Sequence, residues 1–316
     1  MEENKERFLD GLIRELCEEM NIKLEMLSYD WILQLTKDGK VRHITRNHFD
    51  NNAQASGEIA NDKYATYEVL KSQNVPVIEH TMIFNPGTRS RYIQEEEGVW
   101  EIAHKEFERL NHKVVVKPND GWEGKEVSLC HTKKELEVTI EKLFQKHGTV
   151  SICPYYDIKT EYRTFYINGK VELIYGKTKP FVVGDGKSTL EQLIQNLNLP
   201  NKKVVRDNLS LLDMETVLKE GEKVDISWKH NLSGGATPIV LEKNDWYDKI
   251  EKLAIQAGKA MNINFATIDI IRTTDDDLYV LEVNSGVCAT IFTKTVDGGY
   301  EKIKNVYRKA LQDLFA

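Results

Sequence analysis

Cysteine is scarce in this sequence, and the four cysteines lie far apart. Among 316 residues there are only Cys17, Cys130, Cys153 and Cys288. Their spacing forms none of the short pairs that are typical of zinc sites, and a disulfide framework would need a denser set. The sequence therefore predicts four reduced thiols in a cytoplasmic protein.

Long hydrophobic runs are also missing. The first seven residues are mostly polar or charged, and no apolar core of the signal-peptide kind follows them. No apolar run approaches the roughly 20 residues that a bilayer-spanning helix needs. We therefore expect no membrane partner.

Positive charge is not in excess. Lys and Arg total 43 against 50 Asp and Glu, which gives a formal charge of −7. A nucleic-acid partner usually needs a basic face, so this balance argues against one. The hydrophobic fraction of 41% is ordinary for a globular protein. With 316 residues, the chain is expected to form one to three closely packed subdomains.

Several well-known catalytic motifs are absent. The sequence has no nucleophile elbow of the serine hydrolases and no G-x-G-x-x-G after a strand. The segment Gly184–Thr189 resembles the end of a P-loop, but the required earlier glycine would fall at Phe181. A strand, a turn and a helix capped by Ser188 or Thr189 are the better interpretation of this segment.

Apolar periodicity predicts an α+β class with antiparallel sheets and helices in more than one layer. Residues 31–35 and 41–44 read as a hairpin, and residues 50–57 read as a loop. The dipeptide Asn168-Gly169 predicts a second hairpin. The other expected helices are 4–20, one beginning near Asp62, 132–147, 188–197, 245–261 and 299–315, and the other expected strands are 113–117 and 149–153.

The segment 265–286 is the most informative. Asp269 lies inside one apolar run, and Glu282 and Asn284 lie two apart in the next. Strand alternation puts Glu282 and Asn284 on one face, and a connection of residues 274–277 would place Asp269 opposite Glu282. Carboxylate and amide oxygens of this kind suit Mg²⁺ that bridges to phosphates. The alternative is an edge hairpin with solvated carboxylates, which the flanking Ile, Leu and Val argue against.

A second candidate site follows the strand that ends at Lys117. The segment 118–125 carries Gly121 and Gly124 and ends in Lys125. Glycines let backbone N–H groups approach phosphate oxygens, and a lysine supplies positive charge. A surface β-turn with a solvated lysine would explain the same pattern.

Three further features remain open. Glu161 and Arg163 alternate onto one strand face, with Lys177 and Lys179 downstream, and a salt-bridged sheet surface would explain them. The loop 233–237 is either a structural turn or a mobile cover over a site. Cys288 is expected to be small and half-buried rather than a nucleophile.

Taken in order, these segments resemble the ATP-grasp superfamily of carboxylate–amine ligases. The resemblance covers roughly residues 60–300. The segments 182–194 and 231–237 look most like the ligase domain of cyanophycin synthetase and the fused glutathione synthetases. The resemblance implies two α+β lobes with antiparallel sheets that clamp ATP. We expect a short N-terminal segment at 1–62, an N-terminal lobe at 63–156 and a C-terminal lobe at 157–316.

The resemblance implies a role for each position. Arg163, Lys177 and Lys179 would stabilise the acyl phosphate, and Asp269, Glu282 and Asn284 would bind two Mg²⁺, with Mn²⁺ as a substitute. The expected ATP-binding residues are Lys63, Lys117, Gly121, Gly124, Lys125, Pro154, Tyr155, Asp157 and Glu161. The expected substrate loops contain Asn231, Ser233, Gly234, Gly235, Ser285, Gly286 and Cys288.

The sequence also departs from the family. Position 126 is Glu where similar loops usually have Gly, and the hinge carries Cys153-Pro-Tyr in place of an acidic pair. Thr267 stands where D-alanine ligases carry an Arg, which argues against D-alanine ligation. The first 60 residues are short for the usual N-terminal domain, so the substrate site is expected to be built differently.

The expected reaction joins an amino acid or small peptide to an amine through an acyl phosphate. Ligation to a thiol, a kinase reaction, a non-catalytic nucleotide-binding module and a purely structural protein are the alternatives. The resemblance is compatible with a homodimer. It does not identify the two substrates.

Overall fold

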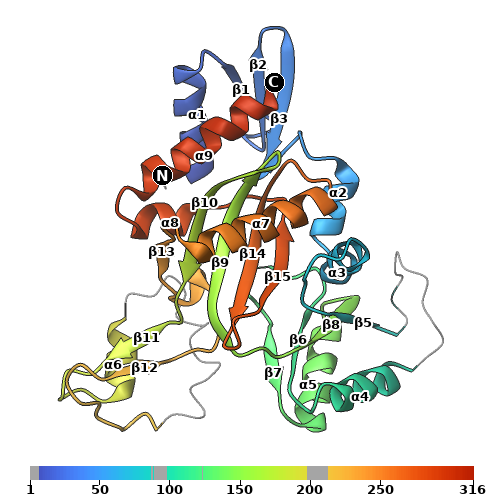
Figure 1. The fold of residues 1–316 in the computed structure, drawn as a ribbon, viewed down its shortest axis with the longest axis vertical. Helices are drawn as coiled ribbons and strands as arrows, with labels where there is room; N and C mark the ends of the chain where they lie inside the picture. Colours follow the sequence, from blue (N-terminus) through green and yellow to red (C-terminus); the bar gives the residue numbers. More distant parts are fainter. Residues whose placement is uncertain (1–6, 87, 89–97, 123, 198–212) are drawn as a thin grey trace.

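The computed structural model describes residues 7–86, 88, 98–122, 124–197 and 213–316. The start of the first predicted helix, residues 4–6, lies outside these residues, as do position 123 and residues 198–212. Within the described residues the fold combines helices with four sheets, as Figure 1 shows. The α+β class is confirmed.

A central antiparallel sheet organises the molecule. Its strand order is β13-β10-β9-β14-β15, and its longest pair is β9 with β14. The bounds are β9 Ile158–Ile167, β10 Lys170–Lys177, β13 Pro238–Val240, β14 Phe265–Thr273 and β15 Leu278–Asn284. The hairpin predicted at Asn168-Gly169 joins β9 to β10, with both turn residues at positive φ.

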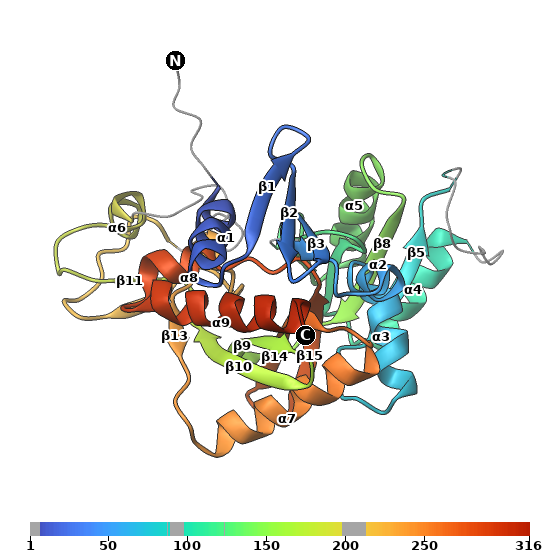
Figure 2. The ribbon, with the colours of Figure 1, turned by 90° about the horizontal axis from the view of Figure 1, so that it is seen from above.

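Helices cover this sheet on opposite faces, as Figure 2 shows. Helix α7 (Asp245–Ala260) packs on Ala266, Ile268 and Ile270 of β14. Helix α9 (Gly299–Leu314) packs on the other face, at Phe265, and the short α8 (Thr290–Thr295) lies beside it. Side chains alternate along β14, so Thr267, Asp269 and Ile271 share the face of Phe265 but lie beyond α9. That part of the face is left for a site.

The N-terminal segment shares its core with the C-terminal helix. Helix α1 (Phe8–Glu19) packs against α9, and the buried Lys304 of α9 pairs with Glu15 and Glu19 of α1. A four-stranded meander follows, with β1 Lys23–Leu27, β2 Ile32–Lys37, β3 Lys40–Thr45 and β4 His48–Phe49. The predicted hairpin is β2–β3. The sequence analysis did not predict β1 or β4.

The next segment corrects one prediction. Residues 50–57 were expected to form a loop, but helix α2 begins at Gln54 and ends at Ala60. Its Ala60 and Ile59 pack against the core under α7, which outweighs the polar composition that suggested a loop. Helix α3 (Lys63–Ser72) then begins after Asp62, whose carboxylate accepts from the N–H of Ala65 at 2.9 Å.

The second sheet has the order β5-β8-β6-β7. The predicted strands at 113–117 and 149–153 are β6 (Val114–Pro118) and β8 (Thr149–Pro154), flanked by β5 (Thr81–Phe84) and β7 (Ser128–Cys130). Helix α4 (Val99–Arg109), which was not predicted, packs on this sheet beside α5 (Lys133–Phe144). Thr132 and Glu135 form a capping box that fixes the start of α5.

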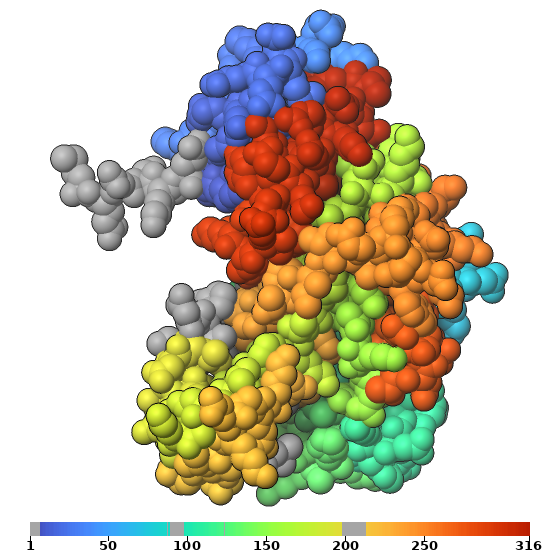
Figure 3. Space-filling view, turned by 60° about the vertical axis from the view of Figure 1, so that its left-hand side comes forward, coloured from blue at the N-terminus to red at the C-terminus, as the bar shows by residue number. Residues whose placement is uncertain are grey.

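A small unit built on β11 (Phe181–Val183), β12 (Lys223–Asp225) and α6 (Leu190–Asn196) has its own core. In Figure 3 the segment coloured yellow, which includes α6, projects from one side of the molecule. The predicted helix start is confirmed, because Thr189 caps α6 with a capping box. The apparent P-loop is therefore a strand–turn–helix.

Two expectations from composition also meet the structure. No helix in the described part of the chain is both long and apolar enough to cross a membrane. All four cysteines are free thiols, and Cys17, Cys130 and Cys153 are buried. Cys288 is exposed, so its predicted half-burial is wrong. It lies in the irregular segment between β15 and α8 and lines the main cavity described below.

Candidate active site between the two larger sheets

A cavity of about 570 Å³ lies between the central sheet and the β5–β8 sheet. Most of the residues that the sequence singled out line it. They are Lys63, Lys117, Gly121, Gly124, Lys125, Pro154, Tyr155, Glu161, Arg163, Lys177, Asn231, Ser233, Asp269, Glu282, Asn284, Gly286 and Cys288. Segments up to 225 residues apart in the sequence, from Lys63 to Cys288, therefore meet at one place.

The face of β14 beyond α9 forms one wall of the cavity, and its residues change in character along the strand. Ile271, Asp269 and Thr267 line it at two-residue intervals, which span about 13 Å along the strand. Ile271 belongs to an apolar cluster with Val115, Cys153 and Tyr155. The cavity is thus apolar at one end, charged at Asp269 and polar at Thr267.

The charged centre is a network of buried ions. Arg163 donates from Nε and Nη2 to the two carboxylate oxygens of Asp269, at 2.8 and 2.6 Å. Lys177 donates to Glu161 and lies 3.3 Å from Asp269. These contacts follow from register, because Asp269 pairs with Arg163 across β9–β14 and Lys177 pairs with Glu161 across β9–β10. The salt bridges that were expected on a sheet surface lie inside a cavity.

Burial and charge act on this network in opposite directions. Burial favours the protonated form of Asp269, but Arg163 and Lys177 outweigh it and hold the pKa of Asp269 below its usual value. Burial raises the pKa of Glu161, and the neighbouring Asp269 adds to that rise while Lys177 opposes it. Burial lowers and the two carboxylates raise the pKa of Lys177, with a net rise. The lysine is thus held protonated between two carboxyl groups.

Glu282 and Asn284 stand beside this network on β15. Asp269 pairs directly with Glu282, as the sequence predicted, and Asn284 donates to Glu282 at 3.1 Å. Arg163 lies 4.0 Å from Glu282. Two carboxylates and an amide oxygen therefore converge at the cavity wall. This set contains only two Asp or Glu side chains. Within the described residues, no group of three or more His, Cys, Asp or Glu side chains is placed to hold a metal ion.

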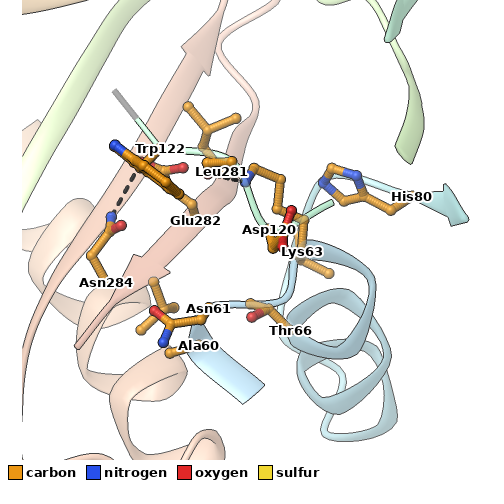
Figure 4. A pocket seen from close by; sticks show the side chains of 13 residues that line it. Ala60, Asn61, Lys63, Thr66, His80, Asp120, Trp122, Leu281, Glu282 and Asn284 are labelled. Carbon is orange, nitrogen blue, oxygen red and sulfur yellow. Dashed lines mark hydrogen bonds between the residues drawn. The ribbon is translucent and has the colours of Figure 1, made fainter. Parts of the chain in front are cut away.

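A smaller pocket of about 250 Å³ opens beside Glu282 and shares part of its lining with the main cavity. Figure 4 shows Glu282 and Asn284 on one wall, with Lys63 and Asp120 facing them. The Lys63 ammonium donates to the carbonyl of Gly121 at 2.5 Å. Burial lowers the pKa of Lys63 to about 8, although Glu282 opposes the shift.

The glycine loop is held from two sides. Gly124 has φ of +63°, and a Cβ there would lie 2.7 Å from the side chain of Asn231. Only glycine allows this approach between the loop and the 231–237 segment. Glu126 adopts φ of +55°, in the left-handed region, and accepts from Lys146 at 2.6 Å and His147 at 2.9 Å. These two contacts hold Glu126 at a position where similar loops usually have glycine.

The segment 231–237 is ordered by its own hydrogen bonds. Asn231 accepts from the backbone N–H of Ser233, which begins a short 3₁₀ helix, η2 (Leu232–Gly234). Gly235 then takes φ of +99°. The segment is a structural turn whose first residues reach the cavity.

Five candidate residues do not line the cavity. Lys179 lies 4.0 Å from Asp225 of β12, and Asp157 accepts through its carbonyl from Thr274. Gly234, Gly235 and Ser285 stand behind the lining, in the turns that carry Ser233 and Gly286. Position on the sheet explains this: Lys179 follows the end of β10 and so leaves the row of Lys177.

Sequence reasoning missed part of the lining. The N-terminal segment contributes Arg46, Asn47 and His48, and the stretch before Asn231 contributes Lys229 and His230. His230 is buried, and its Nδ1 has no hydrogen-bond partner among the described residues. Burial lowers the pKa of His230 to about 4, so the ring is neutral. No local pattern marks these residues, because they reach the cavity only through the packing of separate segments.

The comparisons with known proteins agree with this geometry. Residues 191–303 match the model of the RimK-like ATP-grasp domain. A bifunctional glutathione synthetase from Pasteurella multocida has a similar structure, with a TM-score of 0.56 and 18% identity over 95% of this chain and 43% of that one. D-alanine–D-alanine ligase from Bacillus anthracis gives a TM-score of 0.54 and 17% identity over 84% of this chain and 69% of the other. The fold is therefore that of ATP-grasp ligases, and residues 191–303 match a model of that superfamily.

The curated relatives of this chain are longer proteins. Cyanophycin synthetase from Geminocystis herdmanii is 26% identical over 259 residues, which are 72% of this chain and 27% of the relative. The glutathione biosynthesis bifunctional protein of Clostridium perfringens is 22% identical over 306 residues, 89% of this chain and 35% of the relative. The likeness to cyanophycin synthetase and the fused glutathione synthetases, expected from two short segments, is therefore confirmed. The chain spans only about a third of these relatives or less.

Proposed function

We propose that this chain is an ATP-dependent carboxylate–amine ligase that acts on an amino acid or small peptide. One observation carries the proposal: the face of β14 passes from an apolar end at Ile271 through charges at Asp269 to a polar end at Thr267. This order suits a nucleotide with its base at the apolar end and its phosphates at the charges. A second substrate then has room beyond Thr267.

The phosphate end offers cations from several elements. Lys63 begins α3 and Lys117 lies on β6. Arg163 and Lys177 come from β9 and β10 of the central sheet. Lys117 is buried, with 6% of its surface exposed. The cavity lining contains seven Lys and Arg side chains, namely Arg46, Lys63, Lys117, Lys125, Arg163, Lys177 and Lys229, against the three carboxylates Glu161, Asp269 and Glu282. That surplus of positive charge favours a polyanionic ligand.

The residues present fit a divalent cation of the Mg²⁺ type. Asp269, Glu282 and Asn284 offer only oxygen ligands, few in number, as Mg²⁺ bound to phosphates requires. Asp269 is shared with Arg163, so its own charge is already balanced, and Glu282 is the freer ligand. When bound, the cation would neutralise phosphate charge.

The chain's own residues would then act mainly by position and charge. A substrate carboxylate attacks the γ-phosphorus of ATP and gives an acyl phosphate and ADP. The amine attacks the acyl carbon, and phosphate leaves with the electrons of the acyl C–O bond. Arg163, which is half-buried and fixed by Asp269, faces the developing negative charge. The 231–237 segment and the glycine loop, in contact at Gly124, would exclude water from the acyl phosphate.

The direct test pairs binding with turnover. ATP with Mg²⁺ at about 100 times its dissociation constant should stabilise the fold by about 2.7 kcal/mol, seen as a higher melting temperature. Phosphate release is then screened over pairs of amino acids, with mass spectrometry of the product. An amide product establishes the ligase, a thioester or phosphorylated product supports the thiol-ligase or kinase alternative, and no thermal shift contradicts nucleotide binding.

Lys63 gives the proposal a pH dependence. Its pKa of about 8 in the free protein means that its positive charge is largely present at about pH 7 and largely lost at about pH 9. If the charged form binds phosphate, the dissociation constant of ADP should rise by up to about tenfold over this interval. Calorimetric titration of ADP measures it.

The matched control for this pH dependence is Lys63→Arg, because a guanidinium stays charged throughout the interval. In that variant the affinity should be nearly constant between the two pH values. A wild-type affinity that does not change would remove Lys63 from the phosphate site.

A further inference from the structure

The N-terminal meander reaches the cavity through one tight turn. Strands β3 and β4 pair at Thr45 and His48, so Arg46 and Asn47 form the two-residue turn between them. Arg46, Asn47 and His48 all line the main cavity. This turn lies outside the segments that resemble ATP-grasp ligases.

Three contacts fix the turn against the segment that follows Asn284. The carbonyl of Asn47 accepts from the N–H of Val287 at 3.1 Å. The hydroxyl of Ser285 lies 3.4 Å from Nδ1 of His48, and a Cβ on Gly286 would lie 3.0 Å from the same ring. The next residue, Phe49, packs edge-on against Phe265 with ring centroids 4.8 Å apart. The turn is therefore packed against β14 and against the segment that follows β15.

These contacts place the turn at the polar end of the cavity. Thr267 pairs with Asn284, and Ser285 and Gly286 continue β15 away from Ile271. The apolar end near Ile271 and the turn thus lie on opposite sides of the charged centre at Asp269. A group bound at Arg46 lies beyond the phosphates rather than beside the base.

Arg46 has an unusual backbone and an uncommitted side chain. Its φ of +54° lies in the left-handed region, and the first position of a hairpin turn with positive φ favours glycine. Its guanidinium forms no hydrogen bond or ion pair with a described residue. The three carboxylates of the cavity are near other cations: Asp269 and Glu282 are near Arg163, and Glu161 pairs with Lys177. Arg46 is exposed and lines the cavity with no hydrogen-bond or ion-pair partner among the described residues.

We propose that Arg46 binds a substrate carboxylate other than the one that is phosphorylated. The reacting carboxylate must meet the γ-phosphate near Arg163, so a cation beyond Thr267 suits a second carboxylate. A guanidinium binds a carboxylate through two parallel hydrogen bonds, which also fixes the orientation of the substrate. The second carboxylate belongs either to the amine substrate or to a dicarboxylic donor. This inference rests on the proposed ligase function for the roles of the two substrates.

The kinetic experiment compares Arg46→Ala with wild type on matched substrates. For an amine substrate with a free carboxylate, KM should rise about 10- to 100-fold, while KM for ATP stays unchanged. With the corresponding amino-acid amide, the two proteins should have equal KM. A parallel arm compares glutamate and aspartate with their monoamides as donors. The arm in which Arg46→Ala no longer distinguishes the carboxylate from the amide identifies the source of the carboxylate.

Two variants control this experiment. Arg42→Ala removes a cation from β3, the strand that leads into the turn, and should leave each KM unchanged. Arg42 donates to the carbonyl of Leu314 and does not line the cavity. Arg46→Lys should recover part of the affinity, because it keeps the charge but not the fork. An equal penalty for carboxylates and amides in both arms, or a rise only in KM for ATP, would overturn the proposal.

A binding experiment tests Arg46 without turnover. In the presence of a non-hydrolysable ATP analogue and Mg²⁺, glycine, L-aspartate, L-glutamate, L-arginine and D-alanine are compared with their carboxamides by thermal shift. Wild type should be stabilised more by carboxylates than by amides, and Arg46→Ala should lose the difference. Equal or absent shifts in wild type would overturn the proposal. If no pair of substrates is ligated, the ligase function fails, but this comparison still decides whether Arg46 binds carboxylate.

Discussion

Replacing Glu282 with glutamine is expected to reduce substrate-dependent ADP formation by at least about 100-fold while leaving the fold intact. The amide keeps the size of the side chain and can still accept from Asn284, which lies 3.1 Å away. Glu282 is partly exposed, with 31% of its side chain accessible, so little folding energy depends on its charge. What it loses is an anionic oxygen at the candidate Mg²⁺ site. ADP release and the melting temperature measure the two effects separately.

Asp269→Asn makes the instructive contrast. Asp269 is almost fully buried and pairs with Arg163 and Lys177, so its neutralisation leaves the half-buried Arg163 and the buried Lys177 undercompensated. We expect a loss of activity together with about 3–5 kcal/mol of stability. Loss of activity in this variant therefore does not separate a metal role from a structural one, whereas Glu282→Gln does.

The control for Glu282→Gln is Asp275→Asn, an exposed carboxylate in the turn of the same hairpin. It should change neither turnover nor melting temperature. The residual turnover of Glu282→Gln should also require a higher Mg²⁺ concentration for half-maximal rate. Full turnover at the wild-type Mg²⁺ concentration would exclude Glu282 from the metal site.

The pairing of Asp269 with Glu282 shows how far sequence reasoning reached. The connection of residues 274–277 was predicted correctly. In the structure Arg272 pairs with Leu278, and an unbroken register from that pair would place Leu281 opposite Asp269. A β-bulge between these pairs shifts the register by one and brings Glu282 to Asp269. The alternation of side chains along each strand was visible in the sequence. The bulge that brings Glu282 opposite Asp269 was not visible there.

Charge compensation was the part of the site that the sequence could not supply. The sequence predicted Mg²⁺ at Asp269 and Glu282, yet Arg163 and Lys177 already pair with Asp269. Lys177 also pairs with Glu161. Both cations were singled out as catalytic candidates from the resemblance. Their pairing depends on the register of β9 with β10 and β14, which short motifs do not determine.

The N-terminal segment was the least predictable element. Its helix α1 and hairpin β2–β3 follow from apolar periodicity, and both appear in the structure. Its contribution to the cavity depends on packing against α9 and on the hydrogen bond from Val287 to Asn47, about 240 residues away in the chain. Long-range contacts of this kind leave no local pattern in a single sequence. The division at residues 62 and 156 remains a prediction.

The second large effect is expected from Lys177→Met. Lys177 has only 5% of its side chain exposed and lies between Glu161 and Asp269. Its removal leaves two buried carboxylates with Arg163 as their remaining cation, which costs about 3–5 kcal/mol and lowers the melting temperature by roughly 5–10 °C. Lys142→Met, which removes an exposed cation from α5, is the matched control and should have little effect.

The sign of the pH dependence distinguishes this mechanism from a simple packing defect. Burial, with Asp269, raises the pKa of Glu161 in the folded protein, and Lys177 opposes the rise. Without Lys177 this pKa rises further above its unfolded value. Stability from a group with a raised folded pKa is present below the unfolded pKa and is lost as pH rises through the folded pKa. The melting-temperature deficit of Lys177→Met should therefore be larger at about pH 8 than at about pH 5.

Adding Glu161→Gln should recover much of the deficit at the higher pH, because one of the two uncompensated carboxylates is then gone. Equal deficits at both pH values, with no recovery in the double variant, would show that Lys177 stabilises the fold by packing and not by its charge.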